Sequence, residues 1–383
     1  MNKTLHLIAP FHGTLTAAWS SCAFSQKALR FPKMMQPYGY RVVEYSNGQS
    51  ESLAEEKVVM LTERELETMT GKKDKTAFHG STATIGSPWW TEFDRRLRLA
   101  LKERVQPNDF ICHPFGRAHA GLVRDFPQAH HVETGIGYPD QSFGAFRIYE
   151  SYAWMHYHQG QHLNFDAWGR VVFRDNLPVV GRSGSDYEWV VPNYFDLDDW
   201  TPRTEPGKYL LYFGRICPEK GLSVIQEIAK RIDEKIVVAG QGDITPWAGK
   251  NIEYIGPVTG KARDKLLGEA KAILVPTRFT EPFGGVAVEA MLCGTPAITS
   301  DFGAFTETVD TSLNGWRCHT LRDWLVGISI APAFKRDQIA LHARRRFSLE
   351  TCGKRYDWIF RQISDLECPP GCDPSKTGWY ANT

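Results

Sequence analysis

Short apolar runs alternate with helical patterns through the second half of the chain. The runs at residues 208–213, 235–239 and 272–275 are four to six residues long, which is typical of buried strands. Between them lie segments with apolar residues at helical spacing, such as 222–232 and 261–270. This alternation of strands and helices predicts a parallel, doubly wound α/β sheet.

The first half begins with a similar unit. We expect strands at residues 4–9 and 40–45 with a helix between them, from about Ser20 to Met35. The loop after the first strand contains a single glycine, Gly13, and therefore lacks the G-x-G-x-x-G pattern of dinucleotide-binding dehydrogenases. The unit is Rossmann-like, and its first loop is available for a different ligand.

An aromatic-rich stretch covers residues 143–158. Its aromatic residues recur at spacings of three and four, so we predict a helix that buries one aromatic face. A sugar-stacking platform is the alternative interpretation. The pattern alone favours the core, because aromatic side chains at helical spacing usually pack inward.

The length of 383 residues favours two domains rather than one. A polar stretch with two prolines at residues 198–206 is a candidate linker. We therefore expect a first domain over 1–195, joined by a closing helix and tail at 351–383, and a second domain over 196–350. Both domains are predicted to be Rossmann-like.

Residues 70–87 form a polar stretch without periodicity, which predicts a lid, a binding loop or a disordered segment. Trp89 and Trp90 then lead a basic helix over residues 91–105. Its cationic residues are Arg95, Arg96, Arg98, Lys102 and Arg104. A solvated helix face explains this charge most simply; contact with a membrane surface or an acidic acceptor is the alternative.

The composition is that of an ordinary globular protein, with 42% hydrophobic and 23% charged residues. A net charge of +1 gives no electrostatic signal for nucleic acid, and no apolar run is long enough for a membrane span or signal peptide. Eight cysteines, mostly in apolar settings, predict reduced thiols and a cytoplasmic protein. Cys368 and Cys372 form the only close pair, too few ligands for a structural zinc site.

The strongest chemical signal is the stretch from Arg278 to Pro296. It follows a predicted strand and predicts a tight loop and a helix, with Gly284 and Gly285 where the helix opens. Free backbone N–H groups and the positive end of a helix dipole favour bound phosphate there. Two carboxylates bracket this site: Glu281 in the loop, and Glu289 in an otherwise apolar helix.

The partner of Glu289 is left open by the motif, because a buried carboxylate can pair with a lysine or with the hydroxyls of a ribose. Two cations, Arg215 and Lys220, follow a strand that should neighbour the motif. Together they can neutralise a diphosphate. A surface salt bridge to Glu219 or Asp243 is the alternative.

These residues are similar to the retaining glycosyltransferases of family 4, which have the GT-B fold of two Rossmann-like domains facing across a cleft. The matching motifs are Gly214-Arg215-x-x-Pro218-Glu-Lys220-Gly221, Gly240-Gln-Gly242, Glu281-Pro-Phe-Gly284 and Glu289-Ala-Met-x-x-Gly294-Thr-Pro296. The resemblance covers roughly residues 188–318 in consistent order, whereas the first half resembles the family only in layout.

The resemblance implies a role for each site residue. Glu281 would contact the hydroxyls of the donor sugar, and Glu289 the ribose of the nucleotide. Arg215 and Lys220 would stabilise the diphosphate as it leaves. The remaining positions implied for donor binding or catalysis are His113 beside the transferred sugar, Gly13, Gly214, and the backbone amides of Phe283, Gly284 and Gly285. Such enzymes need no cofactor and no metal, because cationic side chains and amides supply the charge.

The resemblance thus predicts a hexosyl- or pentosyltransferase that uses a nucleotide-diphosphate sugar and retains the anomeric configuration. A sugar-nucleotide epimerase with the same architecture would need no acceptor, and a non-catalytic binding protein would bind the donor without turnover. The acceptor is left open: a glycan or small molecule, a lipid at a membrane surface, or a modified nucleic-acid base. The base and sugar of the donor are also left open.

Overall fold

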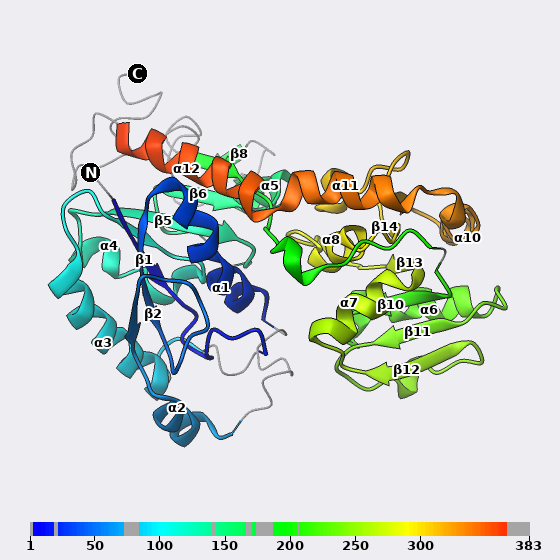
Figure 1. Cartoon of the computed structure of the whole chain (residues 1–383), viewed down its shortest axis with the longest axis horizontal. Coiled ribbons are helices and arrows are strands. Elements are labelled where there is room, and N and C mark those ends of the chain that lie inside the picture. The colour runs from blue at the N-terminus through cyan, green and yellow to red at the C-terminus, as the bar shows by residue number, and fades with distance from the viewer. Residues whose placement is uncertain are drawn as a thin grey trace. The chain divides into compact units, whose positions relative to one another are not determined.

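The structure of the protein, a computed structural model, describes residues 3–18, 22–72, 84–139, 142–161, 187–205 and 207–365, and the backbone alone of 163–165 and 171–173. These residues form two compact units, each built around a parallel sheet (Figure 1). Unit 1 takes its residues from 1–192 and from Cys352 onward, and unit 2 consists of Asn193–Thr351.

Unit 1 contains a seven-stranded sheet in the order β3-β2-β1-β4-β5-β6-β9, in which every pairing is parallel. Its strands are β1 (Thr4–Ile8), β2 (Arg41–Ser46), β3 (Glu56–Val59), β4 (Phe110–Cys112), β5 (His130–Ile136), β6 (Phe146–Tyr149) and β9 (Tyr187–Val190). A separate antiparallel pair consists of β7 (Leu163–Phe165) and β8 (Val171–Phe173). Because the strand order reverses between β1 and β4, the loops that follow these two strands flank the usual ligand position of such a sheet.

Helices cover the unit 1 sheet. They are α1 (Ala23–Met35), α2 (Glu63–Thr70), α3 (Pro88–Arg104), α4 (Leu122–Asp125), α5 (Tyr152–Gln161) and α12 (Leu349–Asp365), with the 3-10 helix η3 (Gly116–His119). Local signals fix several helix starts, for example the reciprocal capping box of Thr62 and Glu65 at α2. From Cys352 onward α12 packs on unit 1, where Phe360 lies 4.8 Å from the ring of Phe110 between centroids.

Unit 2 contains a six-stranded parallel sheet in the order β12-β11-β10-β13-β14-β15. Its strands are β10 (Tyr209–Phe213), β11 (Ile236–Ala239), β12 (Ile252–Gly256), β13 (Ala270–Val275), β14 (Ala297–Ser300) and β15 (Gly315–Cys318). The strand order reverses between β10 and β13, so the loops after these strands take the ligand position. They carry the two predicted phosphate-binding motifs.

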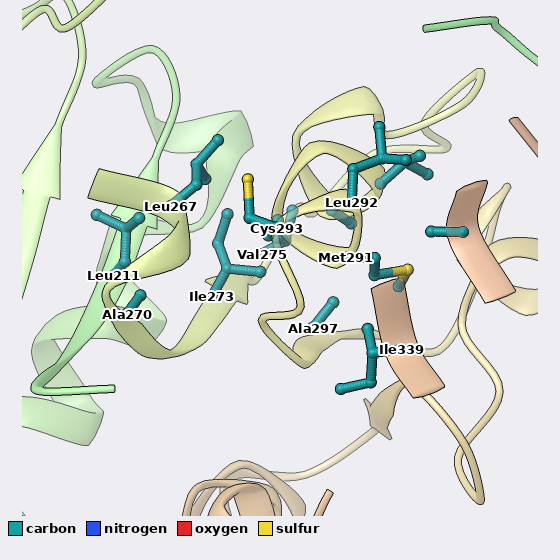
Figure 2. Close-up of a cluster of buried hydrophobic side chains, with 14 of the residues drawn as sticks. Leu211, Leu267, Ala270, Ile273, Val275, Met291, Leu292, Cys293, Ala297 and Ile339 are labelled. Atoms are coloured by element: carbon teal, nitrogen blue, oxygen red, sulfur yellow. The ribbon is translucent and has the colours of Figure 1, made fainter. Parts of the chain in front are cut away.

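The helices of unit 2 are α6 (Leu222–Ala229), α7 (Gly260–Gly268), α8 (Gly285–Leu292), α9 (Phe305–Thr308), α10 (Leu321–Ile330) and α11 (Arg336–Phe347). Helix α8 is apolar on most of its surface, and most of its residues are buried. Figure 2 shows Met291, Leu292 and Cys293 from its end among Ile273 of the sheet and Ile339 of α11. This cluster holds α8, and with it the Glu281 loop, firmly against the sheet.

The predicted fold class is confirmed: two α/β units with doubly wound parallel sheets. One local prediction was wrong. Residues 143–158 are not a single helix, because β6 occupies Phe146–Tyr149 and α5 begins only at Tyr152. The hydroxyl of Ser151 accepts a hydrogen bond from the Trp154 amide (3.1 Å) and so caps the helix there.

Candidate active site

The loops that follow β10 and β13 are held together by a close contact at Gly221 and by a backbone hydrogen bond. Gly221 has a left-handed backbone (φ +78°), and a Cβ at this position would overlap the carbonyl oxygen of Pro276, just after β13. The amide of Arg278 also donates to the carbonyl of Glu219 (2.9 Å). The 215–220 loop is therefore packed directly on the 276–281 loop.

This packing brings Lys220 and Glu281 together. Lys220 lies at the end of the 3-10 helix η6 (Pro218–Lys220), and its Nζ donates to Oε1 of Glu281. The same oxygen accepts a hydrogen bond from the Thr277 hydroxyl (3.0 Å), and the Lys220 ammonium lies 4.7 Å from the centroid of the Phe279 ring. Glu281 is only 7% exposed, so these contacts stabilise a carboxylate that has little access to water.

Arg215 lies in the same loop as Lys220 and is exposed. Its backbone carbonyl accepts a hydrogen bond from the Tyr212 hydroxyl (2.6 Å). Gly214, the first residue after β10, donates its amide to Ala239 (3.0 Å), and the glycine at 240 is required because a Cβ there would overlap the Gly214 carbonyl. The loop thus presents Arg215 and Lys220 from a fixed backbone at the carboxyl edge of the sheet.

The start of α8 is shaped by Gly284. This residue caps the helix with φ +73°, and a Cβ would overlap the ring of Phe305. Phe283 faces the core instead, 5.7 Å from Phe347 between ring centroids, so only its backbone is available to a ligand. The first N–H groups of a helix lack intrahelical acceptors, so those of Gly285 and its neighbours suit an anion.

Glu289 is paired with an arginine that no sequence motif indicated. Nη2 of Arg263, on α7, donates to Oε2 of Glu289, and the two side chains are 18% and 14% exposed. The guanidinium carbon of Arg263 lies 4.6 Å from the centroid of the Phe213 ring at the end of β10. The sequence left a lysine or ribose hydroxyls as partners of Glu289; in the structure the partner is Arg263.

The alternative for Arg215 and Lys220 was a surface salt bridge to Glu219 or Asp243. In the structure the side chain of Lys220 pairs with Glu281. Asp243 accepts a hydrogen bond from the Thr245 amide (2.9 Å). Unit 2 therefore brings Lys220, Glu281 and the α8 start to one edge of its sheet. Glu289 lies further along α8, where Arg263 of α7 pairs with it.

His113 of unit 1 directly follows β4 and is 3% exposed. Its Nε2 lies 3.0 Å from Nδ1 of His131, and Nε2 of His131 lies 3.0 Å from the Phe126 carbonyl. Because a carbonyl can only accept, His131 carries its proton on Nε2 and accepts from His113 Nε2–H. This leaves Nδ1 of His113 as a lone-pair acceptor, and burial lowers the pKa of His113 so that the ring is neutral.

The loop with Gly13 is anchored by Asn47, which sequence reasoning missed. The Asn47 amide donates to the Phe11 carbonyl (2.8 Å), and its oxygen accepts from the Leu61 amide (3.2 Å). Thr14 forms a bridge to Asn47 as well, so the loop after β1 is tied to the segments that follow β2 and β3. Gly13 is buried within this clamped loop.

The basic helix of unit 1 is largely neutralised. Arg96 bonds Glu65 and Glu92, Arg98 pairs with Asp94, and Arg104 bonds Glu56. Trp90 donates its indole N–H to the Ala118 carbonyl (2.9 Å) and packs on the core. This agrees with the interpretation as a solvated helix face.

Across the part of the chain that the structure describes, no helix combines the length and the apolar character needed to cross a bilayer. Two predicted features fall largely or wholly outside the described residues. These are the polar stretch 70–87, of which 73–83 are not described, and the pair Cys368 and Cys372.

Residues 207–325 match the family profile described as "Glycosyl transferases group 1". An uncharacterized glycosyltransferase of Methanocaldococcus jannaschii is 31% identical over 121 residues, 28% of this chain and 31% of the relative. Glycogen synthase of Mycobacterium tuberculosis is 31% identical over 189 residues, 44% of this chain and 45% of the relative. The matched stretches thus span less than half of these relatives.

Solved structures resemble nearly the whole chain. Sucrose-phosphate synthase of Thermosynechococcus elongatus superposes with a TM-score of 0.67 at 15% identity, covering 95% of this chain and 99% of that protein. HepE of Anabaena, in complex with UDP and glucose, has a TM-score of 0.59 at 16% identity, covering 96% and 100%. With the two parallel sheets, this likeness shows that the chain has the GT-B fold.

Proposed function

We propose that the protein is a retaining glycosyltransferase that moves a sugar from a nucleotide-diphosphate sugar to an acceptor hydroxyl. The observation that carries this proposal is the convergence of Lys220, Glu281 and the α8 start at the carboxyl edge of the unit 2 sheet. A cation, a carboxylate and free helix amides suit a diphosphate joined to a polyhydroxylated sugar. The match of residues 207–325 to a glycosyltransferase family supports the same class.

The proposed roles follow the charges. Lys220 and Arg215 would bind the diphosphate, and the amides at Phe283, Gly284 and Gly285 would add hydrogen bonds. Glu281 would accept hydrogen bonds from the sugar hydroxyls. On the family resemblance, we assign His113 and Gly13 of unit 1 to the transferred sugar and its phosphate, and Gly214 to the donor loop.

In the proposed reaction the bond between the anomeric carbon and the diphosphate oxygen breaks as an oxocarbenium-like sugar forms. The acceptor hydroxyl then attacks the same face, and the departing phosphate oxygen takes its proton. No strong protein base is required, and Glu281 acts as a hydrogen-bond acceptor rather than a nucleophile. Because Arg215 and Lys220 neutralise the leaving group, we expect turnover without a divalent metal.

The donor's sugar can be a hexose or a pentose, and the acceptor a glycan, a small molecule, a lipid or a modified nucleic-acid base. HepE was solved with UDP and glucose, which makes UDP-sugars the first donors to test. The neutralised basic helix α3 adds no support for a membrane-bound acceptor.

A donor screen and one variant test the proposal. Thermal shift with UDP-, GDP- and ADP-sugars should identify a donor that raises the unfolding midpoint, because only binding to the folded state stabilises it. Donor hydrolysis and transfer are then measured with the wild type and Glu281→Gln, with Glu227→Gln, an exposed carboxylate on α6, as the matched control. We expect the Glu281 variant alone to lose turnover.

If the wild type and Glu281→Gln bind the donor but show equal and negligible rates of hydrolysis and transfer, the protein is a non-catalytic nucleotide-sugar binding protein. Interconversion of sugar nucleotides without any acceptor would identify an epimerase. Full activity only with added divalent metal, abolished by a chelator, would overturn the metal-independent mechanism.

A further inference from the structure

Arg263 holds one oxygen of Glu289 and leaves the other open. Nη2 of Arg263 bonds Oε2 of Glu289, whereas Oε1 has no hydrogen-bond partner among the residues that the structure describes. This ion pair orients the Glu289 carboxyl group in a helix that is otherwise apolar. An acceptor atom of fixed direction is available beside the α8 start.

Arg263 itself has an unused donor. Its Nε–H is buried and lacks an acceptor within the described residues. The Phe213 ring under the guanidinium and the Glu289 carboxylate fix the plane of the fork, so the side chain is confined while this donor stays unsatisfied. A buried donor without a partner costs free energy, and a ligand oxygen at this position would recover it.

Arg263 thus offers a donor and Glu289 an acceptor, on two side chains that are bonded to each other, and such a pair suits one chemical group best. A hydroxyl can donate its proton to Glu289 and accept an N–H from Arg263 with the same oxygen. A carbonyl or phosphate oxygen would satisfy Arg263 but repel the carboxylate, and an amino group would do the reverse. The pair therefore selects hydroxyl groups, and a vicinal diol offers two.

We propose that Arg263 is a specificity-determining residue for the nucleotide: together with Glu289 it recognises the ribose hydroxyls of the donor and so discriminates ribonucleotides from 2′-deoxyribonucleotides. This inference rests on the proposed function and on the family resemblance, which implies that Glu289 contacts the ribose of the nucleotide. It adds a residue on α7 that lies outside every motif by which the donor site was identified. The preference for ribonucleotides over 2′-deoxyribonucleotides then depends on Arg263, and it does not depend on any contact with phosphate.

The experiment compares dissociation constants by calorimetry for UDP, GDP and ADP and for their 2′-deoxy counterparts. We expect the wild type to prefer the ribonucleotide of its preferred base by about 10- to 100-fold, since a hydrogen bond to a charged group is lost with the hydroxyl. Arg263→Met keeps an aliphatic stem on Phe213 but removes all donors, and should lower this preference to about threefold or less. Arg263→Lys keeps the ion pair and should give an intermediate ratio.

The ratio of the dissociation constants of each 2′-deoxynucleotide and its ribonucleotide counterpart distinguishes ribose recognition by Arg263 from a role in phosphate binding or stability. Both ligands of a pair carry the same base and diphosphate, so a role of Arg263 in phosphate binding or in general stability would weaken both equally and leave the ratio unchanged. The matched control is Arg231→Met, which removes an exposed arginine of unit 2 that pairs with Glu227. This control variant should keep the wild-type ratio. Thermal unfolding of each variant is also measured, and each midpoint should lie well above 25 °C, the temperature of the binding experiment.

Two outcomes overturn the inference in distinguishable ways. If the wild type discriminates but Arg263→Met discriminates equally well, Arg263 has no part in ribose selection and the proposed function stands. If the wild type binds none of the diphosphates, the proposed function fails and this inference falls with it.

Discussion

The ammonium group of Lys220 and the carboxylate of Glu281 form an ion pair, although the two residues are 61 positions apart in the chain. The contact of Gly221 with Pro276 creates this pair, because it seats one loop on the other. An ammonium has three donors, so Lys220 can bind Glu281 and a phosphate oxygen at once. The pair therefore links the sugar end of the proposed donor to its diphosphate.

Lys220→Ala should abolish most turnover. The substitution removes a charge that would stabilise the departing diphosphate, and we expect the rate constant kcat to fall by about 10²- to 10³-fold. Steady-state kinetics with the donor found by thermal shift measures this. Lys230→Ala is the control, because Lys230 forms an exposed pair with Glu227 and should leave kcat unchanged. A Lys220 variant with wild-type kcat would refute its role.

Two neighbouring glycines should respond differently to the same substitution. Gly284→Ala forces a side chain onto a left-handed residue (φ +73°) and into the Phe305 ring, so we expect a loss of roughly 2–4 kcal/mol in the free energy of unfolding. Gly285→Ala meets only ordinary contacts at 3.8 and 3.9 Å and should change stability by less than about 0.5 kcal/mol. Urea unfolding of the two variants measures the difference, and equal losses would contradict this account of the helix start.

Local patterns were enough to predict much of the fold and part of the site. The strands β10, β11 and β13 are apolar runs bounded by glycine or proline, so their positions followed from the sequence, and their alternation with helices predicted parallel sheets. The glycine at 284 indicated the helix start because the backbone conformation there excludes other residues. These features depend on residues close together in the chain.

Tertiary partners were not predictable in the same way. Arg263 reaches Glu289 from another helix, 26 positions away, and nothing in its neighbouring sequence distinguishes it from a solvated arginine. His131 lies on β5, and its hydrogen bond to His113 depends on the register of β4 with β5, which local sequence does not determine. The β6 strand was mistaken for helix because aromatic residues at spacings of three and four fit both a helix face and a strand followed by a helix.

Acid should destabilise unit 1 through its buried histidines. Burial lowers the pKa of His131 to about 4, whereas an unfolded histidine titrates near 6.5. Between these values the unfolded state binds more protons, so stability falls as the pH is lowered through this window. For His131 alone the loss between pH 7 and pH 5 is roughly 1–2 kcal/mol.

Urea unfolding at pH 7 and pH 5 measures this loss in the wild type and in His131→Gln. The variant should lose less stability on acidification by about the amount given for His131, even if it is less stable at both pH values. His156→Gln, which changes an exposed histidine of α5, should keep the wild-type dependence. The same dependence in His131→Gln would show that this histidine does not carry the acid sensitivity.

Cys217 offers a native reporter of the proposed diphosphate site, because it lies between Arg215 and Lys220 and is partly exposed. Burial raises the pKa of its thiol, so alkylation by iodoacetamide is carried out at alkaline pH, where more of the reactive thiolate is present. We expect peptide mapping to show modification of Cys217 that a saturating nucleoside diphosphate slows at least about fivefold, since bound phosphate covers the loop.

Cys293 serves as the internal control for this experiment. It is fully buried in the core of unit 2, and burial raises the pKa of its thiol, so it should stay unmodified with or without nucleotide until the protein is unfolded. Modification of Cys217 at the same rate when the nucleotide demonstrably binds would place the diphosphate away from the 215–220 loop. Protection of Cys217 alone would locate the ligand at that loop, independently of any activity measurement.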